Sequence, residues 1–452
     1  MEHSLTCISP IDGRYCQRTK KLSNYFSEKA LIRYRLRIEI EYFIYLLSTL
    51  NIDISKNKER FNNFKSILRN LYTNIKDENI MKIKEIEKTI NHDVKAVEVF
   101  LRNKLKYYKF DQYNEYIHFG LTSQDINSTS YVLSLYEANN NIIIPNITNF
   151  LISLENIVLT YSNVPMLSRT HGQPATPTLL GKEFNVFTDR LHKQLTLLKS
   201  YRYSTKFGGA IGNLNSHVIT FPDIDWIKFA DLFINSFGFQ RNKYTTQVDI
   251  YDNYSELFDI LKRISTILLD FSRDLWLYIL LDYFKQKCID EEVGSSTMPH
   301  KINPIYFENA EGNLMISITL FEFMSKKLPV SRLQRDLTDS TVLRNIGCCY
   351  GYLLISITSL QEGIKRLEPN LEKINEDLNK NSIVLAEAIQ SILRRELVEN
   401  SYDIVKNITR NQSFSIEQVL NTIEEKIKDH KNKDKIIEEI KLLDVNTYVG
   451  IV

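Results

Sequence analysis

Glycine and proline, the residues that most often interrupt helices, are scarce in this chain: 14 glycines and 10 prolines in 452 residues. Their absence over long spans favours helix. In three stretches apolar residues recur every three or four positions, which places them on one face of a helix. We therefore predict an all-α fold, with one long helix through each stretch. The apolar positions are Ile80, Ile83, Ile86, Ile90, Val94, Val97, Leu101 and Leu105; then Phe184, Phe187, Leu191, Leu195 and Leu198; and then Leu257, Leu261, Ile264, Leu268 and Phe271.

Helix-breaking residues gather in three places, at residues 165–177, 208–212 and 294–304. The helical stretches between them are too long for a small compact domain, and long helices bury their apolar faces side by side in a bundle. We predict three helical domains around a long central bundle. They are an N-terminal domain over residues 1–111, the bundle over residues 112–364 and a C-terminal domain over residues 365–452.

The charge balance and the cysteines argue against several functional classes. The chain has 57 basic and 55 acidic side chains, whereas proteins that bind nucleic acid or anionic membranes need a clustered positive field. The nearest apolar run, residues 139–152, is shorter than the roughly 20 residues that span a bilayer. We expect a cytoplasmic protein that binds neither nucleic acid nor membrane and has no metal site. The cysteines, without a Cys-x-x-Cys pair, suit free thiols: Cys7, Cys16, Cys288, Cys348 and Cys349.

Residues 294–304, with the sequence GSSTMPHKINP, carry the strongest chemical signal in the chain. One interpretation is a connection between two helices, with serines that cap the second helix. The segment is long for a connection, however, and long loops without secondary structure are often lids. Hydroxyl, ammonium and amide groups in one loop can also converge on an anion. The residues by themselves leave both interpretations open.

This loop resembles the GSSxMPxKxNP signature of the fumarase/aspartase superfamily. Further segments resemble one family within it, the adenylosuccinate lyases, and there the bacterial-type subgroup with an Asp-Gly-Arg-Tyr start. The resemblance runs from about residue 9 to about residue 410 and is looser beyond. The segments that carry it are residues 9–15, 91–98, 122–127, 168–177, 294–304 and 335–344.

The resemblance implies an enzyme that eliminates fumarate from adenylosuccinate to give AMP, and from SAICAR to give AICAR, in purine nucleotide synthesis. The reaction needs a base and an acid but no metal or organic cofactor. The family's base corresponds to Ser295, whose hydroxyl needs nearby positive charge such as Lys301. The acid corresponds to His171, whose imidazole exchanges protons near neutral pH. By family analogy Glu308 orients His171, although a surface glutamate is the competing interpretation.

The resemblance also assigns the substrate's end-groups to polar side chains. Thr122 and Ser123 would equally suit a helix N-cap, and both roles can hold because a helix N-terminus attracts carboxylates. The donors implied for the dicarboxylate are Thr122, Ser123, Ser296, Lys301, Asn303 and Asn309. Those implied for the phosphate are Arg14, Arg335 and Arg344, planar forks that match phosphate, with the hydroxyls of Tyr15 and Ser340.

Several histidines and polar residues complete the candidate site. By resemblance, Asn91, His92 and Asp93 lie near the ribose or base, and Gln247 lies near the purine or the succinyl group. His118 is a weaker candidate at the border of the site, and His300 is given no role. Taken without the resemblance, Arg335 and Arg344 would suit a surface equally well.

These candidates come from distant parts of the chain, and the family's solution is a homotetramer in which three subunits build each site. Two alternatives remain open. An argininosuccinate lyase shares the loop and the elimination chemistry, but its substrate carries no phosphate. A lyase fold without activity would serve as a structural or binding protein, although Ser295, His171 and Lys301 are all present.

Overall fold

The computed structural model describes residues 5–287, 298, 300–409 and 416–451. The described residues are mainly helical, with three small two-stranded sheets, so the all-α prediction is confirmed. They form two compact units, each assembled from separate stretches of the chain. The division into three domains stays a prediction. Ser295 and Ser296 lie outside the described residues.

The first unit comprises residues 1–148, 193–269 and 309–359. Its elements are α2 (Cys16–Thr19), η1 (Lys20–Leu22), α3 (Ser23–Phe26), α4 (Glu28–Thr49), α5 (Asp53–Lys56), α6 (Lys58–Thr73), α7 (Asp77–Ile90), α8 (Asp93–Tyr107), η2 (Asp111–Tyr116), α9 (Ser123–Ala138), η3 (Asn139–Ile143), β3 (Ser204–Thr205), α12 (Asn215–Thr220), α13 (Trp226–Asn235), β4 (Gln240–Arg241) and α16 (Thr338–Leu343).

The second unit comprises residues 149–192, 270–308 and 360–452. Its elements are β1 (Pro165–Thr170), β2 (Gln173–Leu179), β5 (Phe284–Gln286), β6 (Leu367–Pro369), α18 (Leu371–Lys380), η4 (Ser382–Leu385), α19 (Ala386–Arg395), α20 (Ser401–Thr409), α21 (Ile416–Lys426) and α22 (Lys433–Lys441). Five long helices contribute residues to both units: α10 (Ile144–Thr160), α11 (Leu180–Ser200), α14 (Asp252–Leu280), α15 (Ile305–Lys327) and α17 (Ile346–Lys365).

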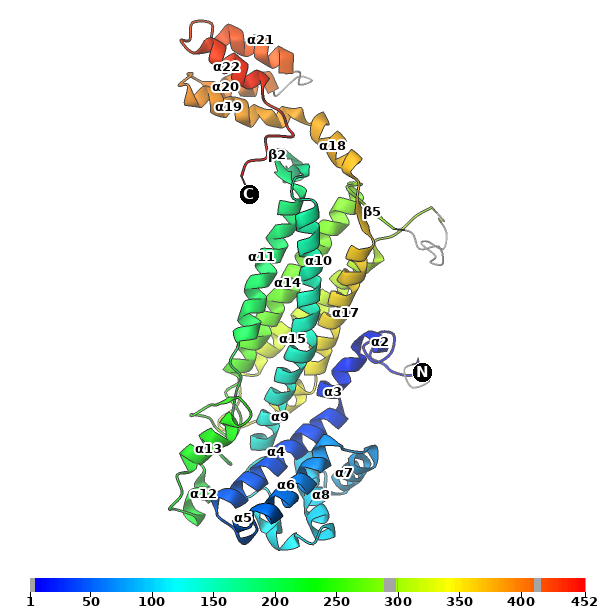
Figure 1. Ribbon diagram of the computed structural model, residues 1–452, viewed down its shortest axis with the longest axis vertical. Helices are drawn as coiled ribbons and strands as arrows, with labels where there is room; N and C mark the ends of the chain where they lie inside the picture. The colour runs from blue at the N-terminus through cyan, green and yellow to red at the C-terminus, as the bar shows by residue number, and fades with distance from the viewer. Residues whose placement is uncertain (1–4, 288–297, 299, 410–415, 452) are drawn as a thin grey trace. The chain divides into compact units, whose positions relative to one another are not determined.

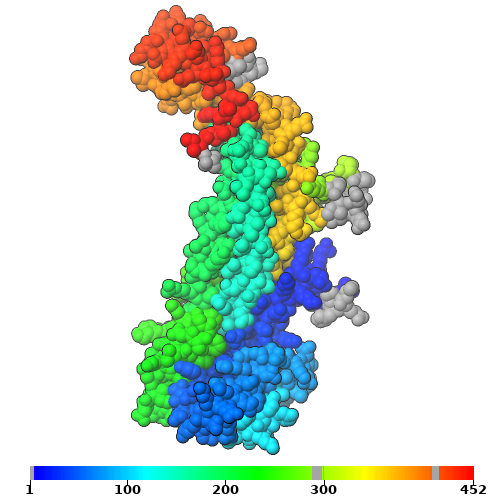
Figure 2. All heavy atoms as spheres, viewed as in Figure 1, coloured from blue at the N-terminus to red at the C-terminus, as the bar shows by residue number. Residues whose placement is uncertain are grey.

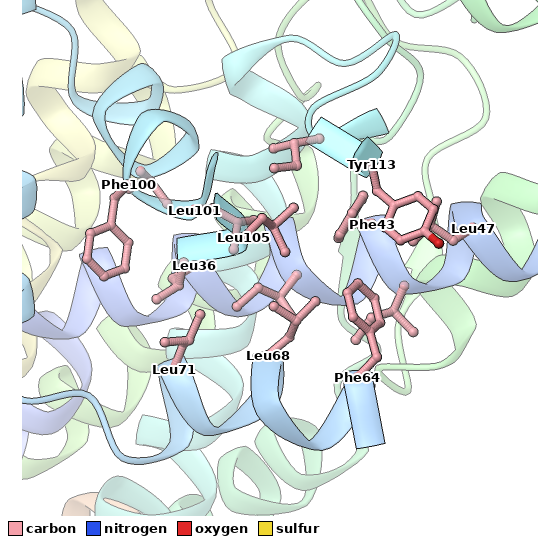
Figure 3. Close-up of a cluster of buried hydrophobic side chains, with 14 of the residues drawn as sticks. Leu36, Phe43, Leu47, Phe64, Leu68, Leu71, Phe100, Leu101, Leu105 and Tyr113 are labelled. Atoms are coloured by element: carbon pink, nitrogen blue, oxygen red, sulfur yellow. The ribbon is translucent and has the colours of Figure 1, made fainter. Parts of the chain in front are cut away.

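The core of the first unit forms where α4, α6 and α8 turn their apolar faces together. Helix α4 begins after Ser27, whose hydroxyl accepts the Ala30 N–H at 3.1 Å and so caps the helix. Each fully buried Leu or Phe contributes about 1.5–3 kcal/mol through removal of apolar surface from water. In Figure 2 the mid-blue to light-blue atoms of this region pack closely together at the lower end of the view. The side chains drawn in Figure 3 include Leu36, Phe43, Leu47, Phe64, Leu68, Leu71, Phe100, Leu101, Leu105 and Tyr113.

One predicted long helix is wrong: residues 80–105 form two helices, α7 and α8, separated at Asn91. Asn91 has a φ of 51°, a left-handed conformation that asparagine tolerates. His92 is extended, and its Nδ1 accepts the Lys95 N–H at 3.1 Å, which caps α8. The apolar spacing continues across the break because both helices pack on the same core. The other two predicted stretches lie within α11 and α14, as expected.

In the second unit, the helices α10, α11 and α14 run alongside one another (Figure 1), and aromatic side chains pack between them. The ring of Phe271 lies 5.6 Å from that of Phe150, 6.0 Å from that of Phe184 and 5.3 Å from that of Phe187. The C-terminal helices α19, α20, α21 and α22 form a separate small core. Its buried side chains include Ile389, Leu393, Val405, Val419, Ile423, Ile436 and Ile440.

Helices α9 and α10 are continuous through the π-helical turn Asn139–Ile143. The turn lies beside Pro145, which lacks the N–H that a regular α-helix would use. The combined stretch, Ser123–Thr160, is long and apolar enough to cross a membrane by length and composition alone, contrary to the expectation that no run would be. In the most apolar part of this stretch 33% of the residues are buried, and length and composition alone are weak evidence because a core helix of a soluble protein passes the same test.

Candidate active site

A cavity of about 420 Å³ in the first unit gathers seven of the predicted substrate-binding residues. Three parts of the chain supply these seven residues: the turn between α7 and α8, the N-terminus of α9, and the segment around α16. A cavity of this size can hold a small organic molecule. The seven residues are Asn91, His92, Asp93, Ser123, Arg335, Ser340 and Arg344. We call it the Asp93 cavity.

Asp93 joins two arginines at one wall of this cavity. Its Oδ2 accepts from Arg35 Nη2 at 2.7 Å and from Arg344 Nη2 at 2.9 Å, and its Oδ1 accepts the Val94 N–H at 2.8 Å. Burial by itself would raise the pKa of Asp93. The charge of Arg35, the Val94 N–H and the charge of Arg344 outweigh burial and lower the pKa below its ordinary value. Asp93 is therefore a carboxylate at neutral pH.

Arg335 connects Gln247 to the cavity. Its Nη1 donates to Gln247 Oε1 at 3.1 Å, and the Gln247 N–H donates to the carbonyl of Gln334 at 3.2 Å. Gln247 is not among the residues that line the cavity, but this contact places it beside one that does. Arg335 and Arg344 thus present two guanidinium groups to one space, which suits a phosphate.

Buried Asp339 fixes the short helix α16, which bears Ser340. Asp339 Oδ2 accepts from the Tyr251 hydroxyl at 2.8 Å and from Gln124 Nε2 at 3.2 Å. Because Gln124 belongs to α9, the same carboxylate ties α16 to the helix that carries Ser123. The sequence offered no signal for this role, since an aspartate beside hydroxyl residues suits a solvated turn equally well.

The N-terminus of α9 is held by a fully buried ion pair. Thr122 is the N-cap residue, and its N–H donates to Asp125 Oδ2 at 2.9 Å. Asp125 Oδ1 accepts from Lys206 Nζ at 2.7 Å and from the N–H of Gly208 at 2.8 Å. The N-cap interpretation of Thr122 is confirmed, while Ser123 lines the cavity. A helix N-terminus of this kind attracts negatively charged groups.

The segment just before Thr122 rests on buried His217. The His217 Nε2 lies 2.9 Å from the Tyr42 hydroxyl, and a Cβ added at Gly120 would lie 2.5 Å from the His217 ring. Only glycine fits at position 120, which also has a φ of 69°. Burial lowers the pKa of His217 to about 4, although the charge of Asp125 acts in the opposite direction.

This low pKa predicts an acid-dependent loss of stability. Below a pH of about 6.5 His217 becomes protonated in the unfolded state. In the folded state it stays neutral until the pH falls to about 4. The free energy of unfolding should therefore fall by about 2 kcal/mol more between pH 7 and pH 5 in the wild type than in His217→Gln. Urea titrations at both pH values measure the difference. An equal fall in the wild type and in His217→Gln would contradict this prediction.

His118, the weaker candidate, pairs with buried Glu39. Its Nδ1 lies 2.9 Å from Glu39 Oε2. Burial would lower the pKa of His118, but the charge and hydrogen bond of Glu39 outweigh burial and raise it. His118 is not among the residues that line the Asp93 cavity.

Tyr15 and Asn309 form a second polar group in the first unit. Asn309 Nδ2 donates to the Tyr15 hydroxyl at 2.9 Å, and Asn309 Oδ1 accepts from Ser359 Oγ at 2.8 Å. Arg18 Nη1 donates to Ser359 Oγ at 2.8 Å. Neither of the first two residues lines the Asp93 cavity, and neither does Arg14. Within one subunit, the residues predicted to bind the phosphate therefore form two groups, one that lines the Asp93 cavity and one that does not.

His171 occupies the turn of the β1–β2 hairpin in the second unit. Thr170 pairs with Gln173, and the two residues between them, His171 and Gly172, have φ values of 53° and 76°. Such a two-residue turn matches the twist of its strands, and it leaves the His171 side chain exposed. Arg169 Nη2 donates to Asp377 Oδ2 at 2.6 Å and anchors β1 on α18. Residues 165–177, where helix-breaking residues gather, thus lie in a hairpin between helices, and the role of His171 stays a prediction.

The other candidates of the second unit lie at or before the start of α15. Glu308 Oε1 accepts from Trp276 Nε1 at 3.2 Å, so the described structure pairs this carboxylate with an indole and shows no contact with His171. Lys301 is exposed and Asn303 is half-buried, while His300 is exposed. The roles assigned to Ser295, Ser296, Lys301, Asn303 and Glu308 stay predictions.

Comparisons with known proteins decide the family. A family model described as "Lyase" matches residues 13–317, and one described as "Adenylosuccinate lyase C-terminal" matches residues 331–449. Adenylosuccinate lyase of Dictyostelium discoideum is 47% identical, with 100% of this chain and 97% of that protein covered. The chain belongs to the adenylosuccinate lyase family.

Bacterial members of the adenylosuccinate lyase family are almost as similar. The protein of Legionella pneumophila (strain Corby) is 44% identical over 99% of this chain and 97% of its own length. That of Escherichia coli (strain K12) is 43% identical over 92% of this chain and 91% of its own length. Membership of this family makes the protein an enzyme of the lyase class.

Solved structures of more distant proteins share the fold. Fumarate lyase from Mesorhizobium sp. BNC1 superposes with a TM-score of 0.72 at 16% identity and covers 95% of both chains. The β-carboxy-cis,cis-muconate cycloisomerase of Acinetobacter calcoaceticus sp. ADP1 gives 0.71 at 16% identity and covers 97% of both. At this identity they support the all-α fumarase/aspartase-like fold of the adenylosuccinate lyase family.

Proposed function

We propose that this protein cleaves adenylosuccinate to AMP and fumarate, and SAICAR to AICAR and fumarate, in cytoplasmic purine nucleotide synthesis. The observation that carries the proposal is the Asp93 cavity. Two guanidinium groups, of Arg335 and Arg344, border the same space as Ser123 at the N-terminus of α9. The two guanidinium groups suit a phosphate, and the N-terminus of α9 suits a carboxylate. One substrate that carries both groups satisfies both features.

The chemical step assigns one proton to each of two residues. The Ser295 oxygen removes a proton from the carbon beside a substrate carboxylate, and the electron pair of that C–H bond forms the new C=C bond. The C–N bond breaks, and His171 donates a proton to the departing nitrogen. The ammonium of Lys301 stabilises the deprotonated oxygen of the serine. Glu308 orients the imidazole of His171.

We further propose a homotetramer in which each site takes residues from three subunits. His171 at an exposed hairpin turn supports this arrangement, because a proton donor needs a partner surface. The separation of Tyr15 from the Asp93 cavity supports it as well. Long helices with exposed apolar side chains, such as Met315, Ile316 and Phe323 on α15, suit association.

Incubation of the purified protein with adenylosuccinate tests the activity directly. AMP and fumarate, followed by absorbance and by chromatography, should appear in equal amounts. Argininosuccinate is the matched alternative substrate, because it undergoes the same elimination but lacks a phosphate for Arg335 and Arg344. Turnover of argininosuccinate alone would replace the proposal by that sibling activity. Release of fumarate from neither substrate would favour a binding or structural role.

The shared site predicts complementation between two inactive variants. Ser295→Ala and His171→Asn tetramers, mixed and allowed to exchange subunits, should regain a part of the wild-type activity. Some mixed sites then combine an intact serine from one subunit with an intact histidine from another. Activity that stays at the level of the separate variants after proven subunit exchange would place both residues in one subunit.

A further inference from the structure

Arg35 lines the Asp93 cavity but is not among the residues predicted to bind the substrate. It lies on α4, and only 2% of its surface is exposed. Its Nε donates to Asn127 Oδ1 at 2.8 Å, and its Nη2 donates to Asp93 Oδ2 at 2.7 Å. Its Nη1 has no hydrogen-bond partner among the described residues. The interior holds such a guanidinium only through its acceptors, because an unpaired buried charge is costly.

Asp93 shares one oxygen atom between two arginines that differ in exposure. The Arg344 side chain is 45% exposed, and it also lies 3.4 Å from Glu28, whereas the Arg35 side chain is 3% exposed. An exposed ion pair is weak and exchanges readily. A buried pair resists separation, since either partner alone would be left uncompensated. An anion that enters the cavity can therefore take Arg344 from Asp93, while Arg35 stays.

We propose that Arg35 is a positioning residue that keeps Asp93 fixed and charge-balanced while Arg344 turns from Asp93 to the phosphate of the bound nucleotide. The inference rests on the proposed function, which supplies that phosphate. Without Arg35, Asp93 holds Arg344 more tightly and competes with the phosphate for it. Arg35 thus sets phosphate affinity through its neighbour and does not touch the substrate.

Arg35→Met in the full-length enzyme tests this role. Loss of a charge-assisted contact predicts that the Kd of AMP, measured by calorimetry, and the KM of adenylosuccinate rise roughly tenfold or more. The kcat should stay within roughly threefold, because the bound substrate reacts as before. The Kd of adenosine, which has no phosphate, should change little. Equal losses for AMP and adenosine, or a lower kcat at unchanged KM, would indicate a merely structural residue and overturn the proposal.

Arg33→Met is the matched control on the same helix. The Arg33 guanidinium donates to the carbonyl of Asn24 at 2.7 Å, outside the lining of the Asp93 cavity. Arg33→Met removes one positive charge, as Arg35→Met does, and it should leave the Kd of AMP unchanged. In an Asp93→Asn background the effect of Arg35→Met on AMP should largely disappear, because the competing carboxylate is gone. An equal effect in both backgrounds would contradict the proposal.

A structure of the wild-type protein with AMP provides the test if Arg35→Met does not fold. The proposal expects Arg344 on the phosphate and Arg35 still on Asp93. AMP bound while Arg344 remains on Asp93 would overturn it. A wild-type protein that binds AMP but releases no fumarate would contradict the proposed function instead, so the two failures are distinguishable.

Discussion

Replacement of Ser295 by alanine should lower kcat for adenylosuccinate cleavage by roughly 10³-fold, because a positioned base typically contributes 10²–10⁴-fold to proton transfer. The Kd of AMP should change little, since the product carries no proton for Ser295 to remove. Steady-state assays of fumarate release and calorimetric titration with AMP measure the two quantities. A Ser295→Ala enzyme with near-wild-type turnover would refute the role of this serine.

His171→Asn is the matching variant for the acid. Position 171 has a φ of 53°, a left-handed conformation that asparagine adopts readily, so the hairpin should persist without the imidazole. A comparable loss of kcat is expected. His300→Ala serves as the control for both variants, because it removes an exposed imidazole from the same loop as Ser295 and has no assigned role. Its turnover should stay within roughly threefold of wild type.

Lys206→Met should cause the largest loss of stability among single substitutions near the site. It removes the ammonium from a pair in which both side chains are fully buried and leaves the Asp125 carboxylate uncompensated. Removal of one partner of such a pair typically costs about 3–5 kcal/mol. The expected result is a fall of this size in the free energy of unfolding of the first unit, measured by urea titration with a probe in that unit.

Two further variants separate the buried pair from the loss of a lysine as such. Lys29→Met removes an ammonium that pairs with Asp77 at the surface, and it should cost less than about 1 kcal/mol. The double variant Lys206→Met with Asp125→Asn should lose less than the sum of the two single variants, because neither charge is then left alone. Additive losses would contradict the buried pairing.

Most of the predicted fold and site rested on the family signature and on the helical spacing of apolar residues. The spacing located α11 and α14, because each presents one continuous apolar face to its neighbours. It failed at Asn91, where a left-handed residue bends the chain while both flanking helices still face one core. Periodicity reports which face is buried, but it does not report where the helix axis changes direction.

The supporting residues of the site could not be predicted in the same way. Arg35 and Arg33 lie two positions apart on one helix with similar neighbours in the sequence, yet only Arg35 reaches Asp93. Likewise Asp339 and Lys206 act through partners more than 80 positions away, in Tyr251 and Asp125. Such roles arise from packing between distant segments, which a single sequence without relatives does not encode locally.

Asp125 accepts hydrogen bonds through both of its carboxylate oxygens, and this arrangement affects how an anion approaches the N-terminus of α9. An acidic residue in the first turn of a helix normally cancels the partial positive charge there and would repel an incoming dianion. Here Lys206 neutralises that carboxylate from inside the protein. The partial positive charge of the amide dipoles at the N-terminus of α9 is therefore not cancelled. This end of the helix still attracts anions, while the hydrogen bonds of Asp125 hold the first turn in place.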